Sequence, residues 1–242
     1  MNTRIVTVSQ NVDLIPVFDP FLEQFPEFIQ QGDAISRYYW NELYTTFPDY
    51  QFALYGGDEE MVGCGHTIPL YWDGTKKHLP GGYDHALKQG FDTNKPNTLC
   101  ALAAVSSTSH KGKGLSYDII RTMKAIAKKN GLTSVIAPVR PTWKQKYPTI
   151  PIEHYAHWKR DDGAPFDPWL RVHWRLGGRQ LGIAPRSMMI KGTVSEWSEW
   201  TGMALPESGQ YVVPGALSLV KIDCDKDCGL YDDPNVWVEH RV

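Results

Sequence analysis

The stretch from Leu99 to Gly131 constrains the fold most, because it places a strand, a glycine-containing loop and a helix in immediate succession. The run from Leu99 to Val105 is apolar and short enough for a strand that is buried on both faces. Two glycines follow, and then apolar residues recur at helical spacing: Leu115, Ile119, Ile120, Met123, Ile126 and Ala127. The helix should end at Asn130-Gly131, a typical C-terminal cap. Because unpaired amides at a helix N-terminus attract anions, the stretch predicts a site for a ligand that carries a pyrophosphate.

Two common phosphate-binding loops do not fit the spacing of these glycines. The P-loop of nucleotide hydrolases requires a Lys-Ser/Thr pair after its last glycine, whereas Gly114 is followed by Leu115 and Ser116. The dinucleotide fingerprint requires a third glycine where Tyr117 stands, and an acidic residue about twenty positions further on, where the chain has none. A nucleotide-binding enzyme with a Rossmann-type start is therefore disfavoured.

The loop instead resembles that of the GCN5-related N-acetyltransferase (GNAT) superfamily. Lys111-x-x-Gly114-x-Ser116 is similar to the Q/R-x-x-G-x-G/A loop that holds the coenzyme A pyrophosphate, with Ser116 in place of the usual Gly or Ala. The resemblance implies acetyl-coenzyme A as the cosubstrate, and it assigns the cofactor-binding role to Val105, Ser107, Lys111, Gly112, Lys113, Gly114, Leu115 and Ser116. An ordinary turn before a core helix is the alternative that the sequence leaves open.

The elements around this loop agree with such a fold. Arg4 to Val8 alternates like a strand, prolines keep the following helices short, and Asp33 is placed to cap another helix. Gln51 to Tyr55 and Met61 to Leu70 are expected to form a hairpin. The resemblance implies an α/β (α+β) fold with a mixed, mostly antiparallel central sheet flanked by helices.

A proline marks the next strand, Thr133 to Val139. Since proline cannot donate to a ladder, Pro138 indicates a strand that lacks a partner along part of one edge. The resemblance implies the same, because the fourth and fifth strands of the family splay apart and the pantetheine arm inserts between them. Further strands are expected over 180–183, 187–193 and 211–222.

Length and composition predict a single domain over residues 1–242. We expect an inserted loop at about 71–97 and an extended C-terminal region at about 191–242. A net charge of -2 without a dense basic tract argues against nucleic acid as a partner. No apolar run reaches membrane-spanning length and no signal peptide is evident, so a cytoplasmic protein is expected. Cys224, Cys228 and His240 provide too few ligands for a metal, and none is expected.

The candidate catalytic residues lie after the glycine loop. The segment Val172 to Gly177 resembles the family's F-Y-E-K-L-G segment, whose tyrosine often protonates the departing thiolate, and His173 occupies the tyrosine position. Histidine can serve as a general acid near neutral pH, although it can also be an ordinary hydrogen-bonding residue. The irregular segment 141–160 offers alternatives: Tyr147 and Tyr155 as acids, and Glu153 and His154 as bases.

We therefore expect an N-acetyltransferase that transfers an acetyl group directly from acetyl-coenzyme A to a small-molecule or other primary amine. The acceptor is expected between the 141–160 segment and the first helical region. A non-catalytic acyl-coenzyme A sensor with the same loop is the alternative. A looser similarity to acetyltransferase-like modules associated with nitrilase-type hydrolases implies a functional link to such a hydrolase. The sequence leaves the oligomeric state open, a homodimer included.

Overall fold

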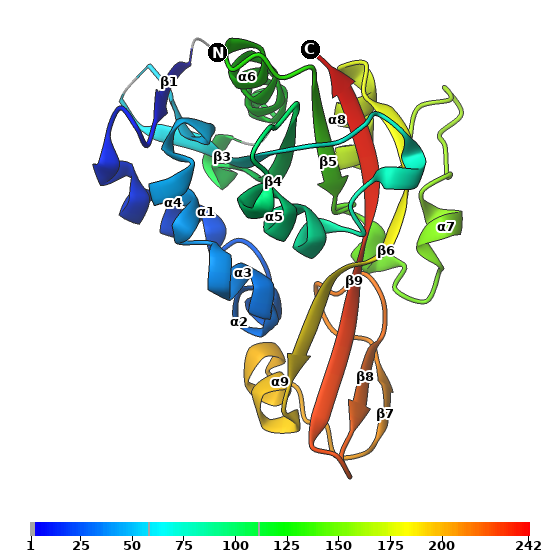
Figure 1. Ribbon diagram of the computed structural model, residues 1–242. Helices are drawn as coiled ribbons and strands as arrows, with labels where there is room; N and C mark the ends of the chain where they lie inside the picture. The colour runs from blue at the N-terminus through cyan, green and yellow to red at the C-terminus, as the bar shows by residue number, and fades with distance from the viewer. Residues whose placement is uncertain (1–2, 58, 111) are drawn as a thin grey trace.

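The computed structural model describes residues 3–57, 59–110 and 112–242, and in them one mixed sheet carries the fold (Figure 1). Its strand order is β1-β2-β3-β4-β5-β9-β8-β7, and β6 pairs with β9. The strands are β1 (Arg4–Thr7), β2 (Gln51–Tyr55), β3 (Met61–Leu70), β4 (Thr98–Ser106), β5 (Ser134–Val139), β6 (Arg179–Gly192), β7 (Gly209–Tyr211), β8 (Val220–Asp223) and β9 (Cys228–Arg241). The β4–β5 pair is parallel and the other pairs are antiparallel, so the expected fold class is confirmed.

The helices are mostly short, as the prolines require. They are α1 (Asp19–Leu22), α2 (Glu27–Gly32), α3 (Ala34–Tyr39), α4 (Glu42–Thr46), α5 (Tyr83–Asp92), α6 (Leu115–Lys129), α7 (Ile152–Tyr155), α8 (Pro168–Arg175) and α9 (Val194–Thr201). Pro16 lies inside a 3₁₀ helix, Pro20 in the first turn of α1, and Pro26 immediately before α2. The Asp33 side chain accepts the amides of Ile35 and Ser36 and so caps α3, as expected.

Strands β4 and β5 diverge after a short stretch of pairing. They pair only where Thr98–Cys100 meets Ser134–Ile136. Where β3 pairs with the other edge of β4, the register shifts so that Leu102 has no partner residue on β3. Strand β5 is paired along its other edge with β9, including at Pro138. The expected splay is therefore confirmed, and it leaves a gap inside the sheet.

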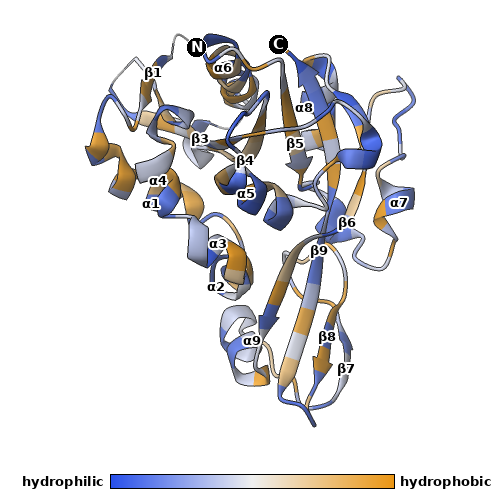
Figure 2. Ribbon diagram, viewed as in Figure 1, coloured by the Kyte–Doolittle hydropathy of each residue, from blue (hydrophilic) through white to orange (hydrophobic). Residues whose placement is uncertain are grey.

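Helix α6 covers β3, β4 and β5 at this gap. Its predicted apolar side chains are all buried, and they pack against apolar residues of the strands. The helix ends at Asn130, followed by Gly131 with φ +70°, as the cap predicted. Figure 2 shows β5 as a largely hydrophobic strand, in agreement with the burial of all its residues.

Strands β6 and β9 are long and extend from the main sheet into a lower lobe with β7, β8 and α9 (Figure 1). One end of β9 lies between β5 and β6, and its other end lies between β6 and β8. The core of the lower lobe includes Trp197, whose ring packs against those of Phe28 and Tyr231. The lobe thus shares its core with α2 of the first helical region.

Two expectations about these segments need correction. The segment 71–97 is not a loop throughout, because it contains the ten-residue helix α5, which packs against β3 and β6. The C-terminal region 191–242 contains, besides its strands of the lower lobe, residues 236–241, which supply a strand of the main sheet. The strand expected over 211–222 is divided into β7 and β8, because Pro214 and Gly215, which has φ +85°, interrupt it.

Replacement of Trp197 by Ala should lower the free energy of unfolding by about 3–5 kcal/mol, because it leaves a large cavity in the core. The Trp197 side chain is 0% exposed, whereas that of Trp174 is 50% exposed. Trp174→Ala is the matched control and should change the free energy by no more than about 0.5 kcal/mol. Urea unfolding measures the free energy of unfolding of both variants, provided that their m-values are comparable. Equal losses of free energy in the two variants would contradict the assignment of Trp197 to the core.

Candidate active site

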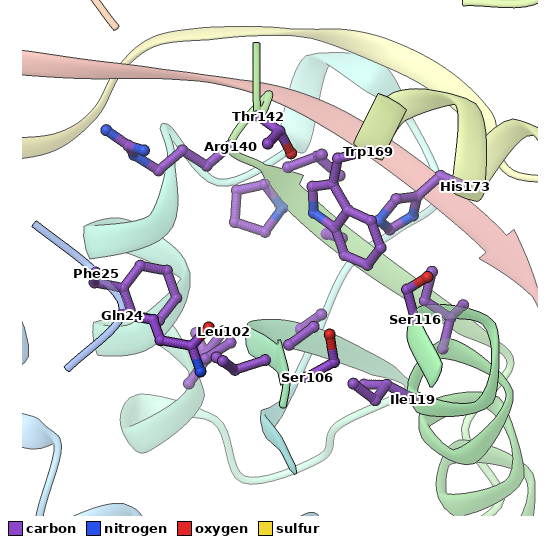
Figure 3. Close-up of a pocket in the computed structure, with 18 of the residues that line it drawn as sticks. Gln24, Phe25, Leu102, Ser106, Ser116, Ile119, Arg140, Thr142, Trp169 and His173 are labelled. Carbon is purple, nitrogen blue, oxygen red and sulfur yellow. The ribbon is translucent and has the colours of Figure 1, made fainter. Parts of the chain in front are cut away.

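A cavity of about 470 Å³ opens at the splay between β4 and β5 (Figure 3). Backbone and side chains of 101–106 on β4 form one wall, and residues 137–140 of β5 and its end form another. Ser116 and Ile119 project from α6, while Trp169 and His173 project from α8 (Figure 3). We call this space the donor cavity.

A second cavity, of about 500 Å³, lies on the side of the first helical region. We call it the acceptor cavity. Both cavities are lined by five common residues, which therefore mark where they meet: Phe25, Leu102, Ala103, Pro138 and Arg140. The remaining lining of the acceptor cavity comes from α1, α2, α3 and the segments beside them, and from Tyr83, Met188 and Asn235. Groups held in the two cavities can thus come together beside the bulge at Leu102.

The N-terminus of α6 stands at the donor cavity. Gly114 is its N-cap residue and has φ +82°, a left-handed conformation that glycine adopts without strain. The Tyr117 and Asp118 amides donate to the Gly114 carbonyl, so the amides of Leu115 and Ser116 precede the first helical hydrogen bonds. Such amides can donate to an anion, and the helix dipole adds partial positive charge.

The predicted cofactor-binding residues are distributed unevenly around this terminus. Val105 and Ser116 line the donor cavity. The Ser107 amide donates to the Val62 carbonyl, and the Lys113 amide donates to the His110 carbonyl, so both already have partners. Gly112 and Gly114 have positive φ, and Leu115 is buried in the core. Lys111 lies outside the described residues.

His173 is the one predicted catalytic residue that lines the donor cavity among those the structure describes. Its side chain is 4% exposed, stacks edge-on against Trp169, and has Nδ1 2.9 Å from Nε2 of His240. Burial, assisted by His240, lowers the pKa of His173 to about 3. At neutral pH its imidazole is therefore uncharged, which works against a role as proton donor.

The other predicted catalytic residues lie away from both cavities. Tyr155 is buried and donates its hydroxyl to Asp167, the N-cap of α8, while Tyr147 packs against the rings of Tyr155 and Trp158. Glu153 and His154 are exposed on α7. None of these four described side chains lines either cavity. The 141–160 segment contributes instead Thr142 and Gln145 to the donor cavity.

The sequence analysis missed Arg140, which lines both cavities immediately after β5. Its Nε donates to Asp233 at 2.9 Å and one of its terminal nitrogens donates to the Gly215 carbonyl at 2.6 Å. Asp233 is fully buried and also accepts from Tyr231 and Asn235, so its position is fixed. The signal that could have indicated Arg140 is its place at the end of the strand that splays from β4.

Phe25 and Trp169 were also missed as lining residues, although Trp169 lies on the same helix as His173. Among the described residues, no group of three or more His, Cys, Asp or Glu side chains could hold a metal ion. In the same described residues, no helix has both the length and the apolar character needed to cross a membrane.

Comparison with known proteins shows which family the chain belongs to. No family model matches the chain. It is 34% identical over 255 residues to the arginine N-acetyltransferase avaD of Aspergillus versicolor, an alignment that covers 92% of this chain and 87% of that protein.

Solved structures show the same fold at lower identity. The loading GNATL domain of CurA from Lyngbya majuscula has a TM-score of 0.58 at 19% identity, and 99% of this chain and 96% of that one are covered. The GNAT-like decarboxylase GphF, solved in complex with isobutyryl-CoA, has a TM-score of 0.58 at 18% identity, with coverage of 100% and 99%.

The splayed strands and the helix N-terminus beside them define an acyltransferase fold. The chain belongs to the GNAT superfamily and is an enzyme of the N-acetyltransferase class. Enzymes of this superfamily take the acyl group from acyl-coenzyme A, which is therefore the cosubstrate. The predicted family and enzyme class are confirmed.

Replacement of His173 by Phe should lower kcat for acetyl transfer by less than about tenfold, because an uncharged imidazole does not supply the proton. Removal of a true general acid lowers kcat by about a hundredfold or more. The measurement combines steady-state kinetics with calorimetry of acetyl-coenzyme A binding, which separates turnover from affinity. A hundredfold fall in kcat at unchanged cofactor affinity would instead establish His173 as the general acid.

Proposed function

We propose that the protein transfers an acetyl group directly from acetyl-coenzyme A, held in the donor cavity, to a primary amine held in the acceptor cavity. The observation that carries this proposal is the junction of the two cavities at Leu102, Ala103, Pro138 and Arg140. A junction of this kind lets the amine attack the thioester without a covalent enzyme intermediate. The reaction forms the amide bond, breaks the carbon–sulfur bond, and releases coenzyme A as its thiol.

The donor cavity fits the parts of acetyl-coenzyme A in order. The α6 N-terminus provides amides for the pyrophosphate, and the unpaired edges of β4 and β5 provide backbone groups for the amide-containing pantetheine arm. The thioester would then lie at the bulge near Leu102, where β4 is irregular. Backbone amides aimed at a developing oxyanion stabilise the transition state.

The acceptor cavity favours an amine that also carries a second charged group. Asp19 and Glu23 are exposed and line its mouth, while Arg37 and Arg140 line other parts of it. The carboxylates suit a guanidinium or ammonium group, and the arginines suit a carboxylate. The name of the related arginine N-acetyltransferase supports an acceptor of this kind, an amino acid with a basic side chain. The acceptor would lie against the first helical region, whereas no residue of 141–160, the other expected wall, lines this cavity.

Gly114→Val should abolish acetyl-coenzyme A binding, because a β-branched side chain would fill the space beside the amides and strain the left-handed backbone. Gly131→Val is the matched control: Gly131 has φ +70° at the opposite end of α6, and space around it is equally open. Both variants lose about 1–2 kcal/mol of stability through backbone strain. Calorimetry should show binding to the control and none to Gly114→Val, and equal affinities would contradict the phosphate site.

The double variant Asp19→Asn, Glu23→Gln should raise KM for arginine by about tenfold with little change in kcat, because each exposed charge pair contributes up to about 1 kcal/mol to binding. Release of coenzyme A thiol is measured with arginine, lysine, agmatine and uncharged amines. Asp13→Asn, an exposed carboxylate that does not line the cavity, is the control. If no amine in the panel releases thiol although acetyl-coenzyme A binds, the protein is an acyl-coenzyme A sensor.

A further inference from the structure

One buried and one partly buried carboxyl group lie behind the wall of the acceptor cavity. Asp33 is 0% exposed; its Oδ1 accepts the amides of Ile35 and Ser36, and its Oδ2 accepts the Ser36 hydroxyl at 2.8 Å. Asp84, in the first turn of α5, accepts the Met189 amide through Oδ2 at 3.0 Å. Its Oδ1 is buried and has no hydrogen-bond partner among the described residues. The neighbouring acid is Asp33.

Both carboxyl groups have a raised pKa. Burial is the main reason that the pKa of Asp84 is raised to about 8, and the charge of Asp33 raises it further. Burial also raises the pKa of Asp33, although its four hydrogen bonds oppose that shift. Asp84 therefore keeps its proton at neutral pH, and the two neighbouring groups titrate as one unit.

Hydroxyl groups connect this pair to the acceptor cavity. Ser36 and Tyr83 both line the cavity. The Ser36 Oγ donates to Asp33 and lies 3.4 Å from the Tyr83 hydroxyl. A proton that leaves a group in the cavity can therefore reach the carboxyl pair through one serine hydroxyl.

Few charged groups surround Asp33 and Asp84. Asp233 on β9 faces Asp84 and raises its pKa, but Arg140 binds Asp233 and offsets part of that charge. Tyr83 on α5 keeps its proton, because burial raises its pKa. Helix α3 contributes Ser36, and β6 contributes the Met189 amide. Arg37 on α3 is exposed at the cavity rather than bound to the pair.

We propose that Asp33 and Asp84 together accept the proton that the acceptor ammonium group must lose, and that the Ser36 hydroxyl relays it. This proposal rests on the proposed function. Once Asp84 has lost its own proton, the amine gives its proton to Ser36 Oγ while Ser36 passes its own proton to the Asp33 carboxylate, so no net charge remains on the serine and the pair holds one proton. The neutral amine then attacks the thioester, and the carboxyl pair later returns the proton to solvent. Asp33 and Asp84 act through Ser36 and are positioning residues, whereas Ser36 contacts the acceptor.

A purely structural role explains less of the geometry. Asp33 caps α3, and Asp84 tethers β6 through Met189, but either task needs only one carboxyl group with its own partners. Neither task requires that the two acids be neighbours, and their proximity raises the energy of the ionised pair. Such an arrangement is typical of groups whose pKa is adjusted for proton transfer.

The decisive variant is Asp84→Asn, because the amide keeps an oxygen for the Met189 amide and an N–H for Asp33. It therefore preserves the contacts of the protonated acid while it removes the titration. In the parent enzyme, kcat should rise with an apparent pKa near 8 that stays constant for two acceptors with different amine pKa values. In Asp84→Asn this rise should be absent, and kcat at alkaline pH should fall by about ten- to a hundredfold. Ser36→Ala should lower kcat by a similar factor.

Asp92→Asn is the matched control, because Asp92 is exposed at the other end of α5 and bound to Lys88. Unchanged kcat and pH profiles in both Asp84→Asn and Ser36→Ala would overturn the proposal while the acetyltransferase function stands. Absence of turnover with every amine in the parent enzyme would overturn both.

Carboxyl infrared difference spectra of the parent and Asp84→Asn proteins test the raised pKa of Asp84 without turnover. We expect the spectra of the parent protein to show a carboxyl group that titrates near pH 8, and those of Asp84→Asn to lack it. No such group in the parent would also refute the proposal.

Discussion

The divergence of β4 from β5 is the constraint on which the rest of the structure depends. Two parallel strands that pair over three residues and then separate expose backbone groups that a continuous ladder would have used. Helix α6 closes one side of the gap, β9 secures the outer edge of β5, and the bulge at Leu102 turns β4 at the place where the two cavities meet. The cleft is thus a consequence of incomplete strand pairing rather than of a separate binding loop.

Local patterns predicted the elements well where one physical signal dominated. The apolar stripe of α6, the Asn130-Gly131 cap, the Asp33 cap and Pro138 each act within a few residues, and the structure agrees with all four. Helix α5 was missed because its segment is rich in polar residues and its burial depends on β3 and β6, which are distant in sequence. The same reason hid β9, whose central place follows from its pairing with both β5 and β6.

The candidate site was predictable only in part, for a related reason. The α6 N-terminus and His173 were found because each carries a local pattern. Arg140, Phe25 and Asp84 carry none, and the pairing of Asp84 with Asp33 becomes visible only when strands and helices bring distant segments together. Burial also changes chemistry that sequence alone assigns: His173, expected to carry a proton, is uncharged at neutral pH.

The long β6–β9 ribbon has a mechanical consequence. Register shifts interrupt its ladder between Gln180 and Gly182 and, over a longer stretch, between Ala184 and Met188, so the longer of these stretches is where the ribbon resists distortion least. Met188 and Asn235 lie at this stretch and line the acceptor cavity, but neither lines the donor cavity. A change in the angle between the lobes would therefore alter the acceptor cavity through Met188 and Asn235, and it would reach the donor cavity through Gly215, so the two binding spaces are mechanically linked by the lower lobe.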